Sequence, residues 1–208
     1  MIESTCNKQI EGKIKMLLSQ NQAKSIATLG VFAGNKKEIP NLQQIKIIQS
    51  QAGIRAYATD RYSIAEFKGT ATDWEEEEIL IPLEALPFLK SAIGDVRITK
   101  IDDRTIKLET ETQAREQTTF IGLFPPIENF VAELDNDQMI PLTDPIALDL
   151  TFLVKASKLG SENDSKRGQK PVFKFYTKGN TERGKPKPVV LKRGGLTVVI
   201  QPTLASVI

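Results

Sequence analysis

The stretch YATDRYSIAEF, from Tyr57 to Phe67, holds two extended runs separated by a short polar corner. The first run ends at Ala58, the residues Thr59-Asp60-Arg61 form a tight bend, and the second run begins at Tyr62. Extended runs on both sides of a short polar bend are typical of a β-hairpin. The corner is either the end of a hairpin and nothing more, or one wall of a binding site.

The composition is that of a globular protein. The chain has 208 residues, of which 40% are hydrophobic and 26% are charged; this is enough for one large or two small domains with a buried core. No apolar run approaches the ~20 residues that span a membrane, and the N-terminal residues lack a signal-peptide pattern. The single cysteine, Cys6, allows no intrachain disulfide. We therefore expect a cytoplasmic protein with no membrane partner.

The absence of histidine narrows the possible chemistry. Mixed Cys/His zinc sites, Ser-His-Asp triads and imidazole acid–base catalysis are all excluded in a chain with no histidine. The pair Gly194-Gly195 lies between two strand patterns and not before a helix, so it is no phosphate-binding loop. The run Glu75-Glu76-Glu77-Glu78 is typical of a solvated loop. We predict that the protein is not an enzyme and has neither cofactor nor metal.

Positive charge is concentrated late in the chain. From Lys155 to Arg193 there are 12 basic and three acidic residues, a local charge of +9 in a chain whose net charge is +2. Such a segment indicates a surface that faces a polyanion. The stretches Gly160 to Lys170 and Lys178 to Lys187 are also rich in Gly, Lys, Ser and Asn, so solvated loops explain the composition equally well.

The periodicity predicts one unit three times: a short strand, a helix and three strands. In the first unit, Ile10, Ile14, Leu17 and Leu18 have helical spacing and predict a helix from Asn7 to Gln20. The expected strands that follow this helix are Gln44 to Gln49, Ile54 to Ala58 and Ser63 to Phe67. The expected second unit has a strand from Ile79 to Ile81, a helix from Leu83, and strands at Val96 to Ile101, Thr105 to Glu109 and Gln117 to Ile121. The expected third unit has a strand from Ile146 to Leu148, a helix from Thr151 to Leu159, and strands at Val172 to Thr177, Pro188 to Lys192 and Leu196 to Gln201.

Three short motifs carry a resemblance to a known family. YATDRYSIA, LFPPIENFVAEL (Leu123 to Leu134) and LTVVIQPTL (Leu196 to Leu204) occur in this order. They resemble the ATDGHRLA, RFPDYRRVLP and YVVMPMRL segments of the bacterial DNA polymerase III β subunit, the DNA sliding clamp. The resemblance implies an α+β DNA-clamp fold of repeated βαβββ units, with the helices on one face of a continuous antiparallel sheet.

The resemblance covers the chain unevenly. Residues 1 to 134 match one complete clamp domain of two units, and residues 135 to 208 match half of another. A full β subunit has six such units, so we expect a shortened clamp of the kind that a phage or another mobile element would encode. The family's Gly-His-Arg becomes Arg61-Tyr62-Ser63, and its Met-Pro-Met-Arg becomes Ile200-Gln201-Pro202-Thr203. These departures put larger groups at the rim of the site.

In the clamp family the three motifs converge on a pocket that takes short peptides from DNA polymerase and other client proteins. An apolar cleft suits Leu or Phe anchors, and exposed strand backbone can pair with an extended peptide. Carried over to this chain, the peptide-binding pocket would contain Thr59, Arg61, Tyr62, Ile64, Pro125, Asn129, Phe130, Val198, Val199, Ile200, Pro202 and Leu204. The alternative is that these residues only close an interface between two domains.

In clamps the helices face duplex DNA and present lysine and arginine to phosphate without reading bases. The candidate DNA-binding residues are Lys8, Lys13, Lys15, Lys90, Lys155 and Lys158. The resemblance implies a processivity factor in DNA replication or repair. A clamp-derived adaptor that binds client peptides without encircling DNA, and a β-rich phage structural protein with a coincidental repeat, are the alternatives.

The third unit has no sister unit in the predicted repeat. Its apolar helix face, near Leu153, Ala156 and Leu159, would then lie in water. We therefore expect a homo-oligomer in which this face meets the same face of another chain. Clamp rings in the family contain twelve units, so counting favours four chains per ring.

Overall fold

The computed structural model describes residues 14–34, 39–71, 76–120, 122–136, 139–141, 148–160, 172–177 and 187–202, without the side chains of residues 14, 15, 135 and 136. Its elements are β1 (Ile14–Leu18), α1 (Gln20–Thr28), β2 (Gln44–Ser50), β3 (Gly53–Thr59), β4 (Ser63–Gly69), β5 (Glu77–Pro82), α2 (Leu86–Ser91), β6 (Val96–Lys100), β7 (Thr105–Glu109), β8 (Ala114–Thr118), α3 (Glu128–Asn136), β9 (Ile140–Pro141), α4 (Leu150–Ala156), β10 (Lys174–Thr177), β11 (Val189–Arg193) and β12 (Leu196–Ile200), with 3-10 turns at Leu29–Phe32, Pro40–Leu42 and Leu83–Ala85.

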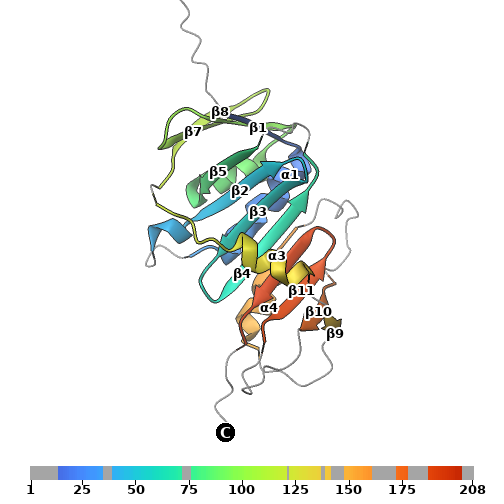
Figure 1. Cartoon of the computed structure of the whole chain (residues 1–208). Coiled ribbons are helices and arrows are strands. Elements are labelled where there is room, and N and C mark those ends of the chain that lie inside the picture. Colours follow the sequence, from blue (N-terminus) through green and yellow to red (C-terminus); the bar gives the residue numbers. More distant parts are fainter. Residues whose placement is uncertain are drawn as a thin grey trace, which may run out of the picture.

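The strands form two antiparallel sheets, with the orders β1-β6-β7-β8 and β5-β2-β3-β4-β12-β11-β10-β9. The first two repeats exchange their first strands, because β1 pairs with β6 and β5 pairs with β2. The third repeat joins the first edge to edge through β12 and β4, where Val199 lies opposite Ile64. Figure 1 shows the long sheet running from β5 to β9.

The helices α1 and α2 pack against each other in antiparallel fashion. Gln20, at the start of α1, donates a 3.0 Å hydrogen bond to the carbonyl of Ala92 after α2. Gly30, after the end of α1, lies against the side chains of Leu83 and Leu86 at the start of the second helical segment. The main core lies between these helices, α4 and the inward faces of both sheets.

The long sheet also carries a helix on its other face. Side chains alternate along β12, so Val198 faces the main core while Val199 packs with Leu134 of α3. In Figure 1, α3 crosses in front of β4 and β11, whereas α1 and α4 lie behind the sheet. The sequence pattern did not predict α3.

The predicted first helix is wrong. The structure has a strand, β1, at Ile14–Leu18, and α1 begins only at Gln20. Met16 and Leu18 are both fully buried, as alternate residues on one face of a strand are. The helix begins at a capping box: Ser19 Oγ accepts from Gln22 N–H, and Gln22 Oε1 accepts from Ser19 N–H. Of the residues expected to form an apolar stripe on this helix, Ile14, Leu17 and Leu18 belong to β1, and Ile10 lies outside the described part of the chain.

The other predicted elements differ mainly at their ends. Most expected strands are present within one or two residues of their predicted bounds, but β8 lies at Ala114–Thr118 and not at Gln117 to Ile121. Leu148 lies outside any strand, and residues 146 and 147 lie outside the described part of the chain.

The predicted exposed face of the third helix is mostly covered. Ala156 and Leu159 are only 2% and 3% exposed, because they pack into the main core of their own chain. Leu153 packs against this core as well and is partly buried. The apolar side chains that α4 leaves in solvent are Leu150 and Val154, which are 71% and 55% exposed.

Candidate functional site

The polar corner between β3 and β4 is held by Asp60 and Thr59. Asp60 Oδ1 accepts hydrogen bonds from the backbone N–H of Tyr62 and from the N–H and hydroxyl of Ser63, at 3.1, 2.8 and 2.8 Å. The Thr59 hydroxyl donates to the carbonyl of Ser63 and accepts from the N–H of Arg61. Both side chains are buried, so they close the turn and cannot line a surface.

Arg61 has a left-handed backbone conformation, with φ of 76°. Among the described residues it is the only non-glycine residue with a positive φ. The segment that this stretch resembles has glycine at the corresponding place, which fits the same backbone requirement. The consequence is that a guanidinium group, exposed to solvent, stands at the corner beside Tyr62, whose side chain is 66% exposed.

Lys155 on α4 connects the third repeat to this corner. Its Nζ lies 2.5 Å from Asp60 Oδ2, and the same ammonium group lies within 6 Å of the ring centres of Phe32 and Phe152 (5.8 and 5.6 Å). The lysine is therefore engaged in holding α4 against the hairpin end. It is not presented to a polyanion as the sequence suggested.

The seam between β4 and β12 brings the corner and the tail together. The N–H of Gln201, which follows β12, donates to the carbonyl of Tyr62 at 3.2 Å. On the outer face of the seam, Ile64 and Val199 lie opposite each other. This face is where two of the three sequence motifs meet.

The third motif supplies α3, which covers the outer face of the seam. Val131 and Leu134 of α3 are 0% and 2% exposed and pack on Tyr57, Ile64 and Val199. At the start of α3, the Glu128 carboxylate lies 2.6 Å from Lys46 Nζ, which also contacts Glu78 at 2.9 Å. Burial lowers the pKa of Lys46, but hydrogen bonds to Glu128 and Glu78 and their negative charges outweigh it, so this pKa lies above its ordinary value.

The structure separates the predicted pocket residues into four sets. Arg61 and Tyr62 at the corner, and Asn129 and Phe130 on α3, are exposed, Phe130 by 40%; these four residues are called the rim. Ile64, Pro125 and Val199 lie below them, half-buried or buried. Val198 and Ile200 face the main core on the opposite side of the sheet, so they cannot line this surface. Thr59 and Pro202 are buried, and Leu204 lies outside the described residues.

Only some of the predicted DNA-binding lysines lie on helices and are exposed. Lys90 on α2 and Lys158 after α4 are exposed on the helix side. Lys15 belongs to strand β1 and not to a helix, while Lys8 and Lys13 lie outside the described residues. Lys24 on α1 was missed, because the wrong helix assignment left it outside any helix; a capping box at Ser19 was the signal that could have found it.

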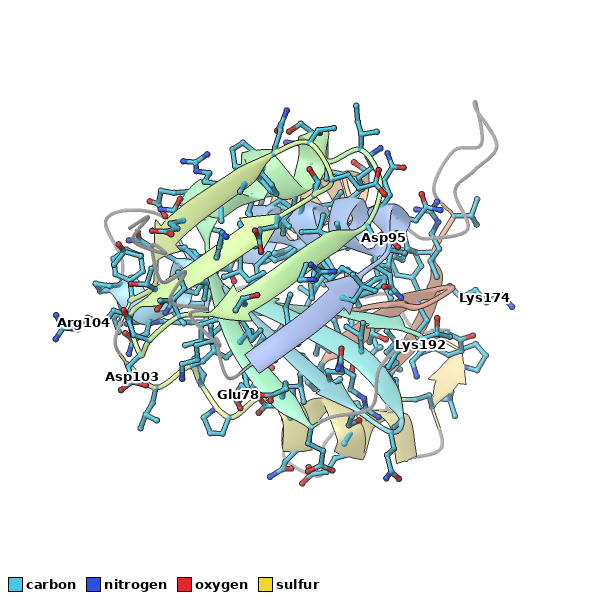
Figure 2. The ribbon with its side chains drawn as sticks, turned by 90° about the horizontal axis from the view of Figure 1, so that it is seen from above. Glu78, Asp95, Asp103, Arg104, Lys174 and Lys192 are labelled. Atoms are coloured by element: carbon cyan, nitrogen blue, oxygen red, sulfur yellow. The ribbon has the colours of Figure 1, made fainter. Side chains whose placement is uncertain are left out.

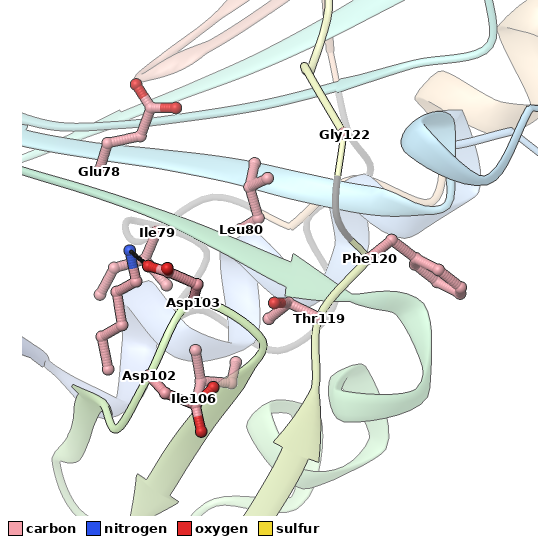
Figure 3. A pocket seen from close by; sticks show the side chains of 10 residues that line it. Glu78, Ile79, Leu80, Asp102, Asp103, Ile106, Thr119, Phe120 and Gly122 are labelled. Carbon is pink, nitrogen blue, oxygen red and sulfur yellow. Dashed lines mark ion pairs between the residues drawn. The ribbon is translucent and has the colours of Figure 1, made fainter.

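A further cavity lies where the two sheets separate. It encloses about 350 Å³ between β5 and the β6–β7 hairpin and is lined by Glu78, Leu80, Asp103, Ile106 and Phe120 among others. Two of its lining residues form an ion pair, with Lys100 Nζ 3.4 Å from Asp103 Oδ1; Asp103 is labelled in Figure 3. Figure 2 shows the neighbouring Arg104 and the distant Lys174 at opposite ends of the molecule.

Two other kinds of site are not found in the described part of the chain. No group of three or more His, Cys, Asp or Glu side chains there is arranged to hold a metal ion. Among the helices described, none combines the length and apolar character needed to cross a membrane.

The fold defined by these sheets and helices is that of the DNA sliding clamps. The structure aligns with the β subunit of DNA polymerase from Streptococcus pyogenes at a TM-score of 0.69 and 13% identity, over 94% of this chain and 67% of that chain. The sliding clamp of Pseudomonas aeruginosa aligns at 0.67 and 11%, over 92% and 67%. The DNA polymerase III subunit beta of Borrelia burgdorferi, solved with a natural product, aligns at 0.66 and 13%, over 99% and 67%.

These similarities confirm the predicted α+β clamp fold, and the chain spans about two thirds of the length of those structures. No protein-family model and no curated protein sequence matches the chain. The likeness is therefore one of fold.

Proposed function

We propose that the protein is a non-enzymatic, clamp-like accessory factor in DNA replication or repair. It contacts duplex DNA without sequence preference and recruits client proteins through a surface at the β4–β12 seam. The fold carries this proposal: α1, α2 and α4 pack in one core against the inward faces of both sheets, and the long sheet continues from the first repeat into the third. We also propose that residues 1–134 act as one complete domain and residues 135–208 as half of another.

The DNA surface would be the helix side, with Lys24, Lys90 and Lys158 in contact with phosphates. Lysine ammonium groups neutralise phosphate charge and release counterions without reading the bases, so such binding is salt-dependent and tolerates sliding. Only a few lysines remain available there among the described residues, because Lys155 is held by Asp60. We therefore expect weak binding of each chain to DNA.

The client surface would be the exposed rim formed by Arg61, Tyr62, Asn129 and Phe130. Exposed Tyr62 and Phe130 offer aromatic contact area, and Arg61 offers a charge for an acidic group on the peptide. Val131 and Leu134 already fill the apolar strip below the rim. The client peptide would thus lie along α3 and the corner, not deep in the seam.

An adaptor that binds client peptides without contacting DNA is the second candidate. The engagement of Lys155 by Asp60 favours it, because this removes one of the six lysines predicted for DNA contact.

Equilibrium binding to two unrelated duplexes of equal length tests the DNA part of the proposal. We expect equal affinities that fall steeply with salt. No binding to either duplex at low salt would favour the adaptor, and a strong preference for one duplex would contradict both functions.

Peptide titrations test the client part. Clamp-binding peptides from the same cell should bind the parent chain and should bind the Tyr62→Ala variant at least about tenfold more weakly, the loss expected for a central aromatic anchor. The control is Phe175→Ala, which removes an aromatic side chain from the other face of the sheet. Equal affinity of the Tyr62→Ala variant and the parent would contradict the assignment of Tyr62 and its exposed neighbours to the client-binding surface.

A further inference from the structure

The strand β5 lies at the edge of the long sheet, with β2 as its partner on one side. Just after β5, the N–H of Leu83 donates to the carbonyl of Gln43 at 3.0 Å, which continues the β2–β5 register. Opposite residues of antiparallel strands alternate between pairs that exchange hydrogen bonds and pairs that exchange none. The odd-numbered residues of β5 therefore bond β2, and the backbone groups of Glu78 and Leu80 point away from it.

These outward backbone groups form a free strand edge. In the described part of the chain, no hydrogen bond joins the backbone of Glu78 or Leu80 to a residue on this side. A row of unpaired N–H and C=O groups is a template on which another extended chain can pair. The edge of β5 is therefore a place where a peptide can add as a further strand.

The cavity of about 350 Å³ lies along this edge, because Glu78 and Leu80 both line it. Its other wall is the corner of the β6–β7 hairpin, which contributes Asp102 and Asp103 (Figure 3). A volume of this size is within the range of ligand-binding pockets in proteins. The free backbone groups thus face a space that can hold part of an extended chain.

The segment after β8 spans the gap between the two sheets. The N–H of Thr119 donates to the carbonyl of Arg104 in the hairpin at 2.7 Å, and the N–H of Phe120 donates to Oε1 of Gln44 at 3.2 Å. Gln44 begins β2 and lies opposite the last residue of β5, so this crossing closes the cavity near that end. The edge stays accessible at its other end, where Glu78 is exposed.

The cavity carries an excess of negative charge. Its charged lining side chains are three carboxylates, of Glu78, Asp102 and Asp103, and one ammonium group, of Lys100. The backbone N–H of Arg104, which Asp102 accepts at 2.7 Å, holds the pKa of that carboxyl below its usual value and keeps it ionised at neutral pH. This charge favours a cationic ligand and opposes the equally acidic edge of a second copy of the chain.

Glu78 remains available to a further cation. Its carboxylate lies 2.9 Å from Lys46 Nζ, but the same ammonium group contacts Glu128 at 2.6 Å, so two carboxylates share one positive charge. The side chain of Glu78 is 55% exposed, whereas that of Lys46 is 12% exposed. A ligand at the edge of β5 would therefore meet the carboxylate before the lysine.

We propose that an extended peptide with basic side chains adds to β5 as a further strand, bonded to the backbone of Glu78 and Leu80, with a lysine or arginine between Glu78 and the Asp102-Asp103 corner. The backbone groups would supply affinity, and the carboxylates would select the basic residue. In the long sheet, β2 and β3 separate β5 from the β4–β12 seam. The site is thus distinct from the proposed client and DNA surfaces, and either can fail without the other.

Fluorescence anisotropy with labelled synthetic hexapeptides tests this site on the full chain. One peptide alternates valine with lysine, and the other alternates valine with glutamate. We expect the lysine peptide to bind at least about tenfold more tightly, because of the charge of the cavity. N-methylation of the backbone of the lysine peptide removes its N–H donors and should weaken its binding at least about tenfold, because strand pairing is lost.

The double variant Asp102→Asn/Asp103→Asn should bind the lysine peptide at least about fivefold more weakly than the parent. The matched control is Glu111→Gln/Glu116→Gln, which removes two exposed carboxylates outside the cavity and should leave the affinity unchanged. Circular dichroism establishes that both variants are folded.

Four results would each overturn the proposal: no binding of the lysine peptide up to the millimolar range, equal affinities for the two peptides, equal affinities with and without N-methylation, or equal affinities of the parent and the Asp102→Asn/Asp103→Asn variant. An apparent affinity that falls as the protein concentration rises would overturn it as well, because copies of the chain would then occupy the edge of β5 themselves.

Discussion

The ammonium group of Lys155 on α4 lies 2.5 Å from a carboxylate oxygen of Asp60 at the β3–β4 corner, ninety-five residues away in the chain. The contact joins the third repeat to the first at the place where β4 and β12 pair. It also gives the polar corner a structural role: Asp60 uses one oxygen to close the turn and the other to hold α4.

Replacing Lys155 by glutamine should destabilise the chain by about 1–3 kcal/mol, because Asp60 is left buried without its charged partner. Urea unfolding measures this change in the free energy of unfolding. Lys158→Gln is the control on the same helical segment: its side chain is exposed, so its effect on stability should stay within about 0.5 kcal/mol. If both variants have the same stability, the ion pair does not hold α4.

Arg61→Gly should stabilise the fold by about 1 kcal/mol, because a left-handed backbone costs roughly that amount in a residue with a side chain. Arg61→Ala removes the guanidinium group but keeps the strained backbone, so comparison of the two variants separates backbone from side chain. Urea unfolding of both supplies the numbers. A glycine variant no more stable than the alanine variant would show that the φ of 76° stores no strain.

Tyr57 should make the protein sensitive to alkaline pH. Burial, followed by the negative charge of Glu66, raises the pKa of Tyr57 from 10.0 to about 12. Folding therefore favours the neutral phenol, and this stabilisation is complete below pH 10 and is lost as the pH rises through about 12. We expect the free energy of unfolding to fall in this window.

Ultraviolet titration of the tyrosines and urea unfolding at several pH values test this dependence. The Tyr57→Phe variant should lose the late titration step and part of the alkaline destabilisation. A remaining part is expected from Lys46, whose raised pKa acts in the same direction. An identical pH dependence in variant and parent would exclude Tyr57 as the cause.

The strands were predictable because their signals are local. The turn at Gly53, where φ is 118°, and the hairpin at Gly194, where φ is 54°, separate strands that the sequence patterns predicted. The strand at Ile14–Leu18 was mistaken for a helix, since such a short apolar run is compatible with both the helical period of 3.6 residues and the strand period of 2. Only its pairing with β6, more than seventy residues later, makes it a strand.

The helix α3 was missed, although Ile127, Val131 and Leu134 have helical spacing. The family segment RFPDYRRVLP ends in proline, whereas Ala132 stands at the corresponding place here, so the helix can continue to Asn136. Leu134 then reaches Val190 and Val199 on the outer face of the sheet. The motifs placed Val198, Val199 and Ile200 in one pocket, but strand alternation sends the first and last of these to the other face.

Duplex DNA binding as a function of salt concentration tests the clamp-like role most directly. The parent is compared with a variant in which Lys24, Lys90 and Lys158 on the helix side are replaced by glutamine, and with a control in which Arg104, Lys107 and Lys174, away from the helices, are replaced in the same way. The slope of log affinity against log salt should become shallower by about 2 to 3 in the helix variant, through the loss of three phosphate contacts, and should not change in the control. Equal slopes for the parent and the helix variant would contradict DNA binding through the helix face.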